Sequence, residues 1–138
     1  MGSTFQADTP GNRHIATLDV ASVASDGAAS RFVVLNAAQN IQILAAKWEV
    51  QGADQGANSA SYRSVQLVNG GSAGTATTVV ASLGFTASLA SLSNNALTGT
   101  ATVASGAQVM FSQNTVGGAH SDGTVVIAGR LQVEYRLL

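Results

Sequence analysis

The sequence predicts an all-β fold, a sandwich or a barrel. Apolar and polar residues alternate with a period of two along most of the chain, and residues typical of turns interrupt this alternation about every eight to fifteen positions. A chain of 138 residues is the size of one ordinary domain and can bury roughly two-thirds of the surface that its unfolded form exposes. We therefore expect a single β domain over residues 12–138.

The clearest alternation lies at the C-terminal end, in TVVIAGRLQVEYRLL (124–138). Apolar residues from Val125 to Leu137 fall on one face, and charged residues such as Arg130 and Glu134 fall on the other. At ~3.3 Å per residue, one strand of this length would run about 40 Å. Together with this strand, seven further segments make eight expected strands: 13–24, 30–36, 41–50, 61–69, 77–87, 97–104 and 107–114.

Turn residues separate these strands at suitable places. Asp26-Gly27, Asn69-Gly70-Gly71 and the segment GGAHSDG (117–123) each contain residues that tolerate positive φ. The segment 88–97 is ambiguous, because the spacing of Leu89 and Leu92 would suit one helical turn that Asn94-Asn95 would end. We expect a loop there, with at most one turn of helix.

Residues 1–11 form no part of this pattern. They are polar, show no period and contain Pro10, the only proline of the chain. We expect a short, flexible, extended N-terminal arm, which a neighbouring molecule could order.

The composition limits the classes of partner. Charged residues make up only 9% of the chain, against about 25% in an ordinary soluble domain, and the formal net charge is −1. A neutral surface rich in Ala, Ser, Thr and Gly suits contact with protein, whereas nucleic acid would require an excess of cations. No apolar run reaches the ~18 residues of a membrane span, and no signal peptide is evident, so we expect synthesis in the cytoplasm and no membrane partner.

Few residues are candidates for chemistry. The chain has no cysteine and only two histidines, His14 and His120, which are far apart, and Asp54 is one of several scattered acids. His120, Ser121 and Asp122 are the residue types of a hydrolase triad, but three consecutive residues in a turn rarely point at one another. The glycine-rich segment 70–74 lacks the lysine and the following helix of a phosphate loop. We expect no enzyme, no catalytic, metal or cofactor site, and no small-molecule substrate.

The single tryptophan and the single lysine are neighbours in the segment 44–52. Period-two parity places Trp48 inside with Ala46 and Val50, while Lys47 and Glu49 face outward. The same parity would place Ile41 and Ile43 outward, where they would need a neighbouring subunit or a covering loop. Of the aromatic residues, Tyr135 is expected in the core and Tyr62 is expected to be exposed.

The order of these elements resembles a known family. The segment FVVLNAAQNIQILAAKWEV is followed by a polar loop, by SYRSVQLVNGG and by TVVASL, and the chain ends in ASGAQV, a glycine pair and a long final strand. Over residues 13–138 this is similar to the jelly-roll head-decoration, or cement, proteins of tailed bacteriophages. The resemblance implies an eight-stranded antiparallel jelly-roll β-sandwich that forms a homotrimer, binds the major capsid protein on the outer surface of the virion and stabilises contacts between capsomers. It implies no enzymatic activity.

Two alternatives remain open. One is a carbohydrate-binding jelly-roll module of a phage fibre or a bacterial adhesin, against which the scarcity of exposed aromatic residues counts. The other, a small hydrolase using His120 or His14, lacks the necessary constellation. Under the decoration hypothesis, the residues expected at partner interfaces are Phe5, Pro10, Ile41, Ile43 and Tyr62.

Overall fold

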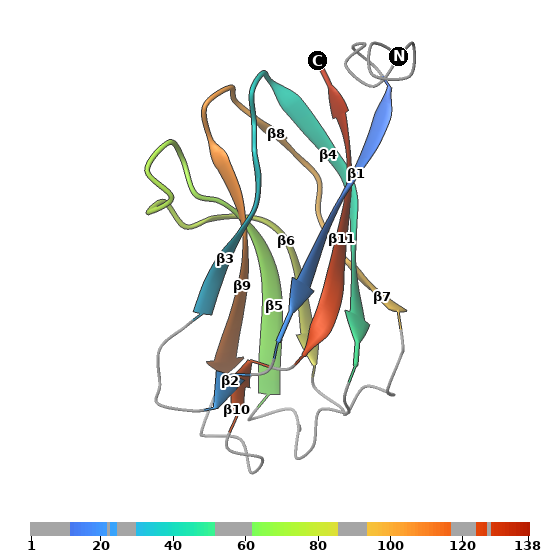
Figure 1. The fold of residues 1–138 in the computed structure, drawn as a ribbon, viewed down its shortest axis with the longest axis vertical. Coiled ribbons are helices and arrows are strands. Elements are labelled where there is room, and N and C mark those ends of the chain that lie inside the picture. The colour runs from blue at the N-terminus through green and yellow to red at the C-terminus, as the bar shows by residue number, and fades with distance from the viewer. Residues whose placement is uncertain are drawn as a thin grey trace.

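The structure, a computed structural model, describes residues 12–21, 23–24, 30–51, 62–85, 94–116, 124–126 and 128–138. These residues form a β-sandwich and contain no helix (Figure 1). For several residues at strand ends, among them Tyr62 and Arg63, only the backbone is described. The strands in chain order are β1 (Arg13–Val20), β2 (Val23–Ala24), β3 (Ser30–Asn36), β4 (Ile41–Val50), β5 (Tyr62–Asn69), β6 (Thr78–Phe85), β7 (Asn94–Leu97), β8 (Ala101–Val103), β9 (Gln108–Val116), β10 (Thr124–Val126) and β11 (Gly129–Leu137).

Two antiparallel sheets face each other. One has the order β1-β11-β4-β7, with β8 also paired to β4, and the other has the order β3-β9-β5-β6. Strands from the two ends of the chain are thus neighbours in both sheets, as in the double Greek key of a jelly roll. The prediction of an all-β antiparallel jelly roll is confirmed.

Two predicted strands are each divided in the structure. The segment 13–24 forms β1 and β2, and the segment 124–138 forms β10 and β11, with β2 and β10 paired as a separate small sheet. The pairing of β11 with β4 ends at Val50 opposite Gly129, followed by one backbone hydrogen bond of 3.0 Å from Gln51 N to the carbonyl of Ala128. The final strand thus begins at Gly129, so the expected uninterrupted 40 Å strand is wrong.

The expected loop at 88–97 ends in a strand. Asn94–Leu97 is β7, whose backbone pairs with β4 from Glu49 to Ala46, whereas Leu89 and Leu92 lie outside the described residues. Asparagine is rare in strands, but β propensity yields to pairing and burial, and Leu97 is buried in the core. The expected loop is therefore wrong from Asn94 to Leu97.

A β-bulge changes the facing of β4 halfway along its length. Ala45 is opposite Glu134 and Ile43 is opposite Tyr135, so Leu44 is an extra residue with no partner on β11. One extra residue reverses the parity of everything before it. Ile41 and Ile43 are consequently 1% and 0% exposed in the core, and the prediction that they face outward is wrong.

The core lies between the two sheets and is centred on Trp48, which is 0% exposed and stacks on Phe111 of β9 with ring centroids 4.8 Å apart. On one side the sheets are joined by a bridge between Ser82 of β6 and Thr98, with backbone hydrogen bonds of 2.9 and 3.0 Å. The edge strands on the other side are β1 and β3. The inward facing predicted for Trp48 is confirmed.

Candidate protein-contact surfaces

The outer face of the sheet β1-β11-β4, here called the charged face, carries nearly all the charged side chains that the structure describes. Inward residues of β1 and β11 alternate with these outward ones, as the burial of both strands shows. Of the described charged side chains, only Arg31 belongs to the other sheet. The charged residues of this face are Arg13, Asp19, Lys47, Glu49, Arg130, Glu134 and Arg136.

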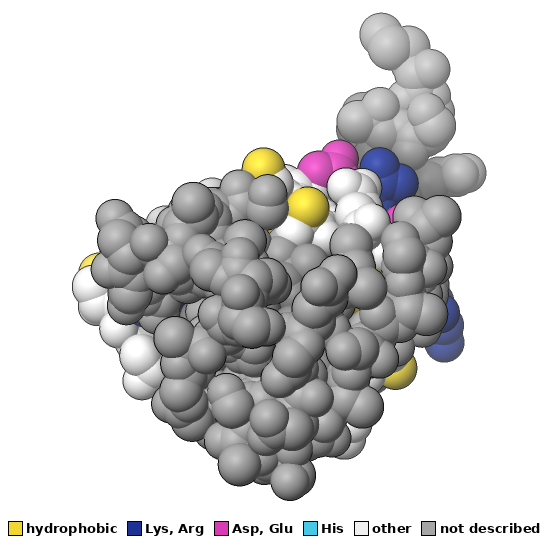
Figure 2. Space-filling view, turned by 90° about the horizontal axis from the view of Figure 1, so that it is seen from below, with side chains coloured by type: hydrophobic (Ala, Val, Ile, Leu, Met, Phe, Trp, Pro, Cys, Tyr) yellow, Lys and Arg dark blue, Asp and Glu magenta, His cyan; other side chains and the backbone are white. Residues whose placement is uncertain are grey.

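Opposite charges on this face are paired across strands. Arg13 donates to Glu134 and Arg130 donates to Asp19, each at 2.7 Å. The hydrogen bond to Asp19 and the attraction of its carboxylate raise the pKa of Arg130, and Glu49 adds a weaker pull in the same direction. Figure 2, which shows the molecule from below, likewise shows acidic and basic side chains side by side at one edge.

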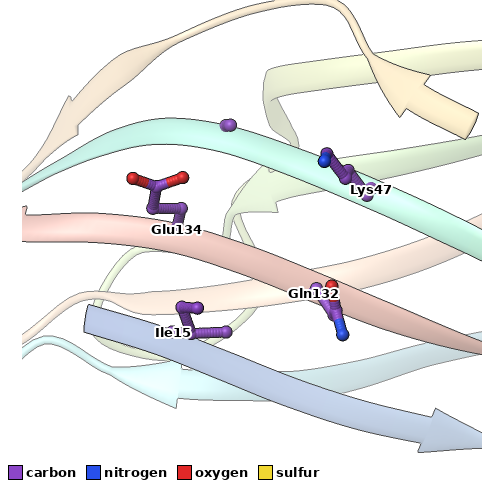
Figure 3. A pocket seen from close by; sticks show the side chains of 5 residues that line it. Ile15, Lys47, Gln132 and Glu134 are labelled. Atoms are coloured by element: carbon purple, nitrogen blue, oxygen red, sulfur yellow. The ribbon is translucent and has the colours of Figure 1, made fainter. Parts of the chain in front are cut away.

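A shallow depression lies in the middle of the charged face, and Ile15 forms one of its walls. Ile15 is 70% exposed, the largest value among the exposed large hydrophobic residues of the described part. Figure 3 shows its side chain on the same side of three adjacent strands as those of Gln132 and Glu134 on β11 and Lys47 on β4. The depression thus combines the exposed Ile15 and the small Ala45 with three polar or charged side chains.

The outer face of the other sheet differs in chemistry. A row of apolar residues crosses all four of its strands, from Val33 through Met110 and Val68 to Val79, each opposite the next. We call this set the valine row. Val33 and Val79, at its two ends, are 42% and 47% exposed, while Met110 and Val68 are buried.

The turn between β5 and β6 covers the centre of the valine row. A Cβ on Gly70 would lie 2.9 Å from Met110 Sδ, so the glycine allows the turn to approach the methionine closely. Arg31 Nη2 donates to the carbonyl of Ala76 at 2.7 Å, which fastens the turn to β3. The reversal predicted at Asn69-Gly70-Gly71 is confirmed, with Asn69 Oδ1 accepting from Gly71 N at 3.0 Å and Gly71 at φ 67°.

A hollow of about 470 Å³ opens between the start of β1, the end of β11 and the loop from β3 to β4. His14 faces into it and stacks on Tyr135 with ring centroids 5.3 Å apart. Leu35, Ile41 and Leu137 add apolar walls, and Gln39 contributes an amide. Tyr135 was predicted as a core residue and is half-buried against the core at this rim.

The remaining predicted site residues are not brought together by the described structure. Phe5, Pro10, Asp54 and the segment His120-Ser121-Asp122 lie outside the described residues, and Tyr62 is described only by its backbone in β5. Ile41 and Ile43 belong to the core of the chain itself rather than to an outward face, and Ile41 also lines the hollow. Within the described ranges no three or more His, Cys, Asp or Glu residues gather as a metal site, and no helix could span a membrane.

Sequence reasoning missed two features. Ile15 shares the parity of Arg13, Thr17 and Asp19, and an isoleucine in a polar row was a usable signal for an exposed apolar residue. The hollow had no such signal, because it is assembled from three segments far apart in the chain.

The comparisons with known proteins show likeness at the level of fold. No protein-family model and no curated protein matches the sequence. A chain in the solved acid-stable capsid structure of Helicobacter pylori bacteriophage KHP30 is similar, with a TM-score of 0.55 and 15% identity over 94% of this chain and 90% of that chain. A chain of the infectious bursal disease virus VP2 subviral particle matches with a TM-score of 0.36 and 9% identity, over 94% of this chain and 34% of that one.

Proposed function

We propose that this chain is a structural capsid component, a decoration or cement protein that binds the outer surface of a phage head and stabilises contacts between capsomers. The shared jelly-roll fold supports this proposal, since the similar chain in the KHP30 capsid structure is 90% covered and is thus of nearly the same size. The partner would be the major capsid protein. The proposal assigns no catalytic role to any residue.

Ile15 is the observation that carries the proposal. An exposed isoleucine costs hydration free energy that its burial against a partner recovers, about 1.5–3 kcal/mol for a whole side chain. At protein interfaces, such anchors are typically surrounded by polar groups that exclude water. The depression beside Lys47, Gln132 and Glu134 has this composition, so we assign the capsid contact to the charged face.

We propose further that the chain forms a homotrimer, and the valine row supports this. Interfaces between permanently associated subunits are more apolar than separable ones. Val33 lies on the edge strand β3 and Val79 on the opposite edge strand β6. A cyclic trimer requires two different patches on each copy, one for each neighbour, and the two ends of the row provide them.

The test is co-sedimentation with heads assembled from the major capsid protein encoded alongside this chain and lacking their own decoration. Ile15→Glu should abolish binding, because it places a charge at the centre of the contact. Ala104→Glu, at an exposed position in the turn between β8 and β9, is the charge-matched control and should bind normally. Wild-type protein that stays in the supernatant would refute the capsid role, and wild-type binding by Ile15→Glu would refute the assigned face.

A further inference from the structure

Two residues that line the hollow each carry a buried nitrogen without a hydrogen-bond partner. Within the part of the chain that the structure describes, these atoms are His14 Nε2 and Gln39 Nε2. Leaving such a group unsatisfied costs about 1–3 kcal/mol. Ordered water would satisfy these atoms, and a hollow of about 470 Å³ also has room for a larger occupant that would do the same.

The walls indicate the chemistry of that occupant. Leu35, Ile41 and Leu137 offer an apolar surface beside the Tyr135 ring. The amide nitrogen of Gln39 donates a hydrogen bond, whereas an imidazole nitrogen donates or accepts according to its tautomer. An extended peptide suits this combination, because its backbone carries both N–H and C=O groups and one apolar side chain can fill the space.

The floor of the hollow is held in place before anything binds. Ala37 N donates to the carbonyl of Ala107 at 2.9 Å, and Gly106 N donates to the carbonyl of Ala37 at 2.7 Å. Asn40 accepts from Leu138 N through its carbonyl and from Ser105 N through its side chain, each at 2.9 Å. An occupant therefore would not have to order this loop, which lowers the free-energy cost of binding.

Residues 1–11 of the chain match the occupant described above, an extended peptide with one large apolar side chain. They include one aromatic residue, Phe5, and their length, about 36–40 Å when extended, would reach a neighbouring subunit. β1 is paired with β11 from Arg13 onward, so this segment joins the sheet at the rim of the hollow and would have to reverse sharply to enter it. The exposed Val33 is two residues from Leu35 on β3, so a copy packed against Val33 would lie next to the hollow.

We propose that the hollow binds the N-terminal segment, residues 1–11, of a second copy of this chain. Phe5 occupies the apolar part, and the backbone around it bonds to His14 and Gln39. This inference rests on the proposed homotrimer and extends it, because each copy would then be tied to the next by its own N-terminal segment.

The absence of cysteine from the chain allows a direct test. Phe5→Cys and Gln39→Cys are introduced into separate chains that differ in size through a tag, and the two are assembled together and oxidised mildly. A docked segment raises the local thiol concentration to about the millimolar range, so the mixed disulfide should form roughly 100-fold faster than between untethered chains. Ala38→Cys, also in the wall of the hollow, replaces Gln39→Cys if that variant folds poorly.

Phe5→Cys combined with Thr17→Cys is the control, since Thr17 is exposed on the charged face, and it should link only at the background rate. An equal rate in this control, or a disulfide formed only within a chain that carries both Phe5→Cys and Gln39→Cys, would overturn the inference. Head binding without the interchain disulfide leaves the capsid role standing and refutes docking of the segment. An interchain disulfide without head binding would support docking of the segment and refute the capsid role.

Discussion

Gly129 of β11 lies directly against the indole of Trp48 on β4. A Cβ at position 129 would come within 2.6 Å of Trp48 Cη2 and 2.5 Å of the carbonyl oxygen of Glu49. On its other side the indole stacks on Phe111 of the opposite sheet. The ring therefore fills the sandwich from the backbone of one sheet to the side chains of the other, and only a glycine leaves room for it.

Gly129→Ala should destabilise the fold by about 1–3 kcal/mol, the range typical of overpacking in a dense core. The expected measurement is the midpoint of urea unfolding followed by circular dichroism. Adding Trp48→Leu, which shortens the ring, should relieve part of the clash, so the two substitutions together should cost less than the sum of their separate effects. Strict additivity would show that the alanine methyl group does not meet the indole.

Trp48→Ala should cost about 3–5 kcal/mol in the free energy of unfolding, as truncations of buried aromatic residues do. Lys47→Ala, at the exposed neighbouring position, serves as the control and should change stability by no more than about 0.5 kcal/mol. Unfolding in urea measures both. Unchanged stability in Trp48→Ala together with lost binding to a partner would mean that the tryptophan is a contact residue rather than a core residue.

Alternation along the chain was sufficient to predict the fold class and the inward facing of Trp48, because both depend on local periodicity. The failures occur where periodicity is interrupted by a tertiary feature. The bulge at Leu44 is visible only when β11 is alongside, since Leu44 then proves to be the one residue of β4 that has no partner on β11. Strand β7 forms for a similar reason: pairing with β4 makes Asn94-Asn95 extended despite the low strand propensity of asparagine.

The charged face likewise depends partly on local periodicity and partly on tertiary structure. Alternation along the final strand was sufficient to place Arg130 and Glu134 on the outward face. The acid that Arg130 meets depends on the register of β1 against β11, where Asp19 is opposite Arg130. The hollow lined by His14 and Gln39 depends on the register of β1 against β11 and on the conformation of the loop from β3 to β4. Local periodicity specifies neither of these.

The bulge leads to a matched prediction on two isoleucines. Ile43→Ala should cost about 2–5 kcal/mol, because it removes buried methyl groups and leaves a cavity. Ile15→Ala, the same substitution on the charged face, should change stability by no more than about 0.5 kcal/mol. Thermal and urea unfolding of the two variants would test this difference. Equal, small effects would mean that Ile43 faces outward, as a strand without the bulge would place it.

The valine row predicts the effect of charge on self-association. Val33→Glu and Val79→Glu each place a carboxylate on a half-exposed apolar position, which a packed interface would have to bury without a partner charge. Each should shift the chain from trimer to monomer in sedimentation velocity experiments, while circular dichroism shows an unchanged fold. Because the two ends of the row would meet different neighbours in a cyclic trimer, either substitution alone should be sufficient.

Ile15→Glu, which carries the same charge on the other sheet, should remain trimeric. If both valine variants stayed trimeric, the subunit contact would have to lie elsewhere, and the valine row would be only an exposed apolar strip next to its own covering turn.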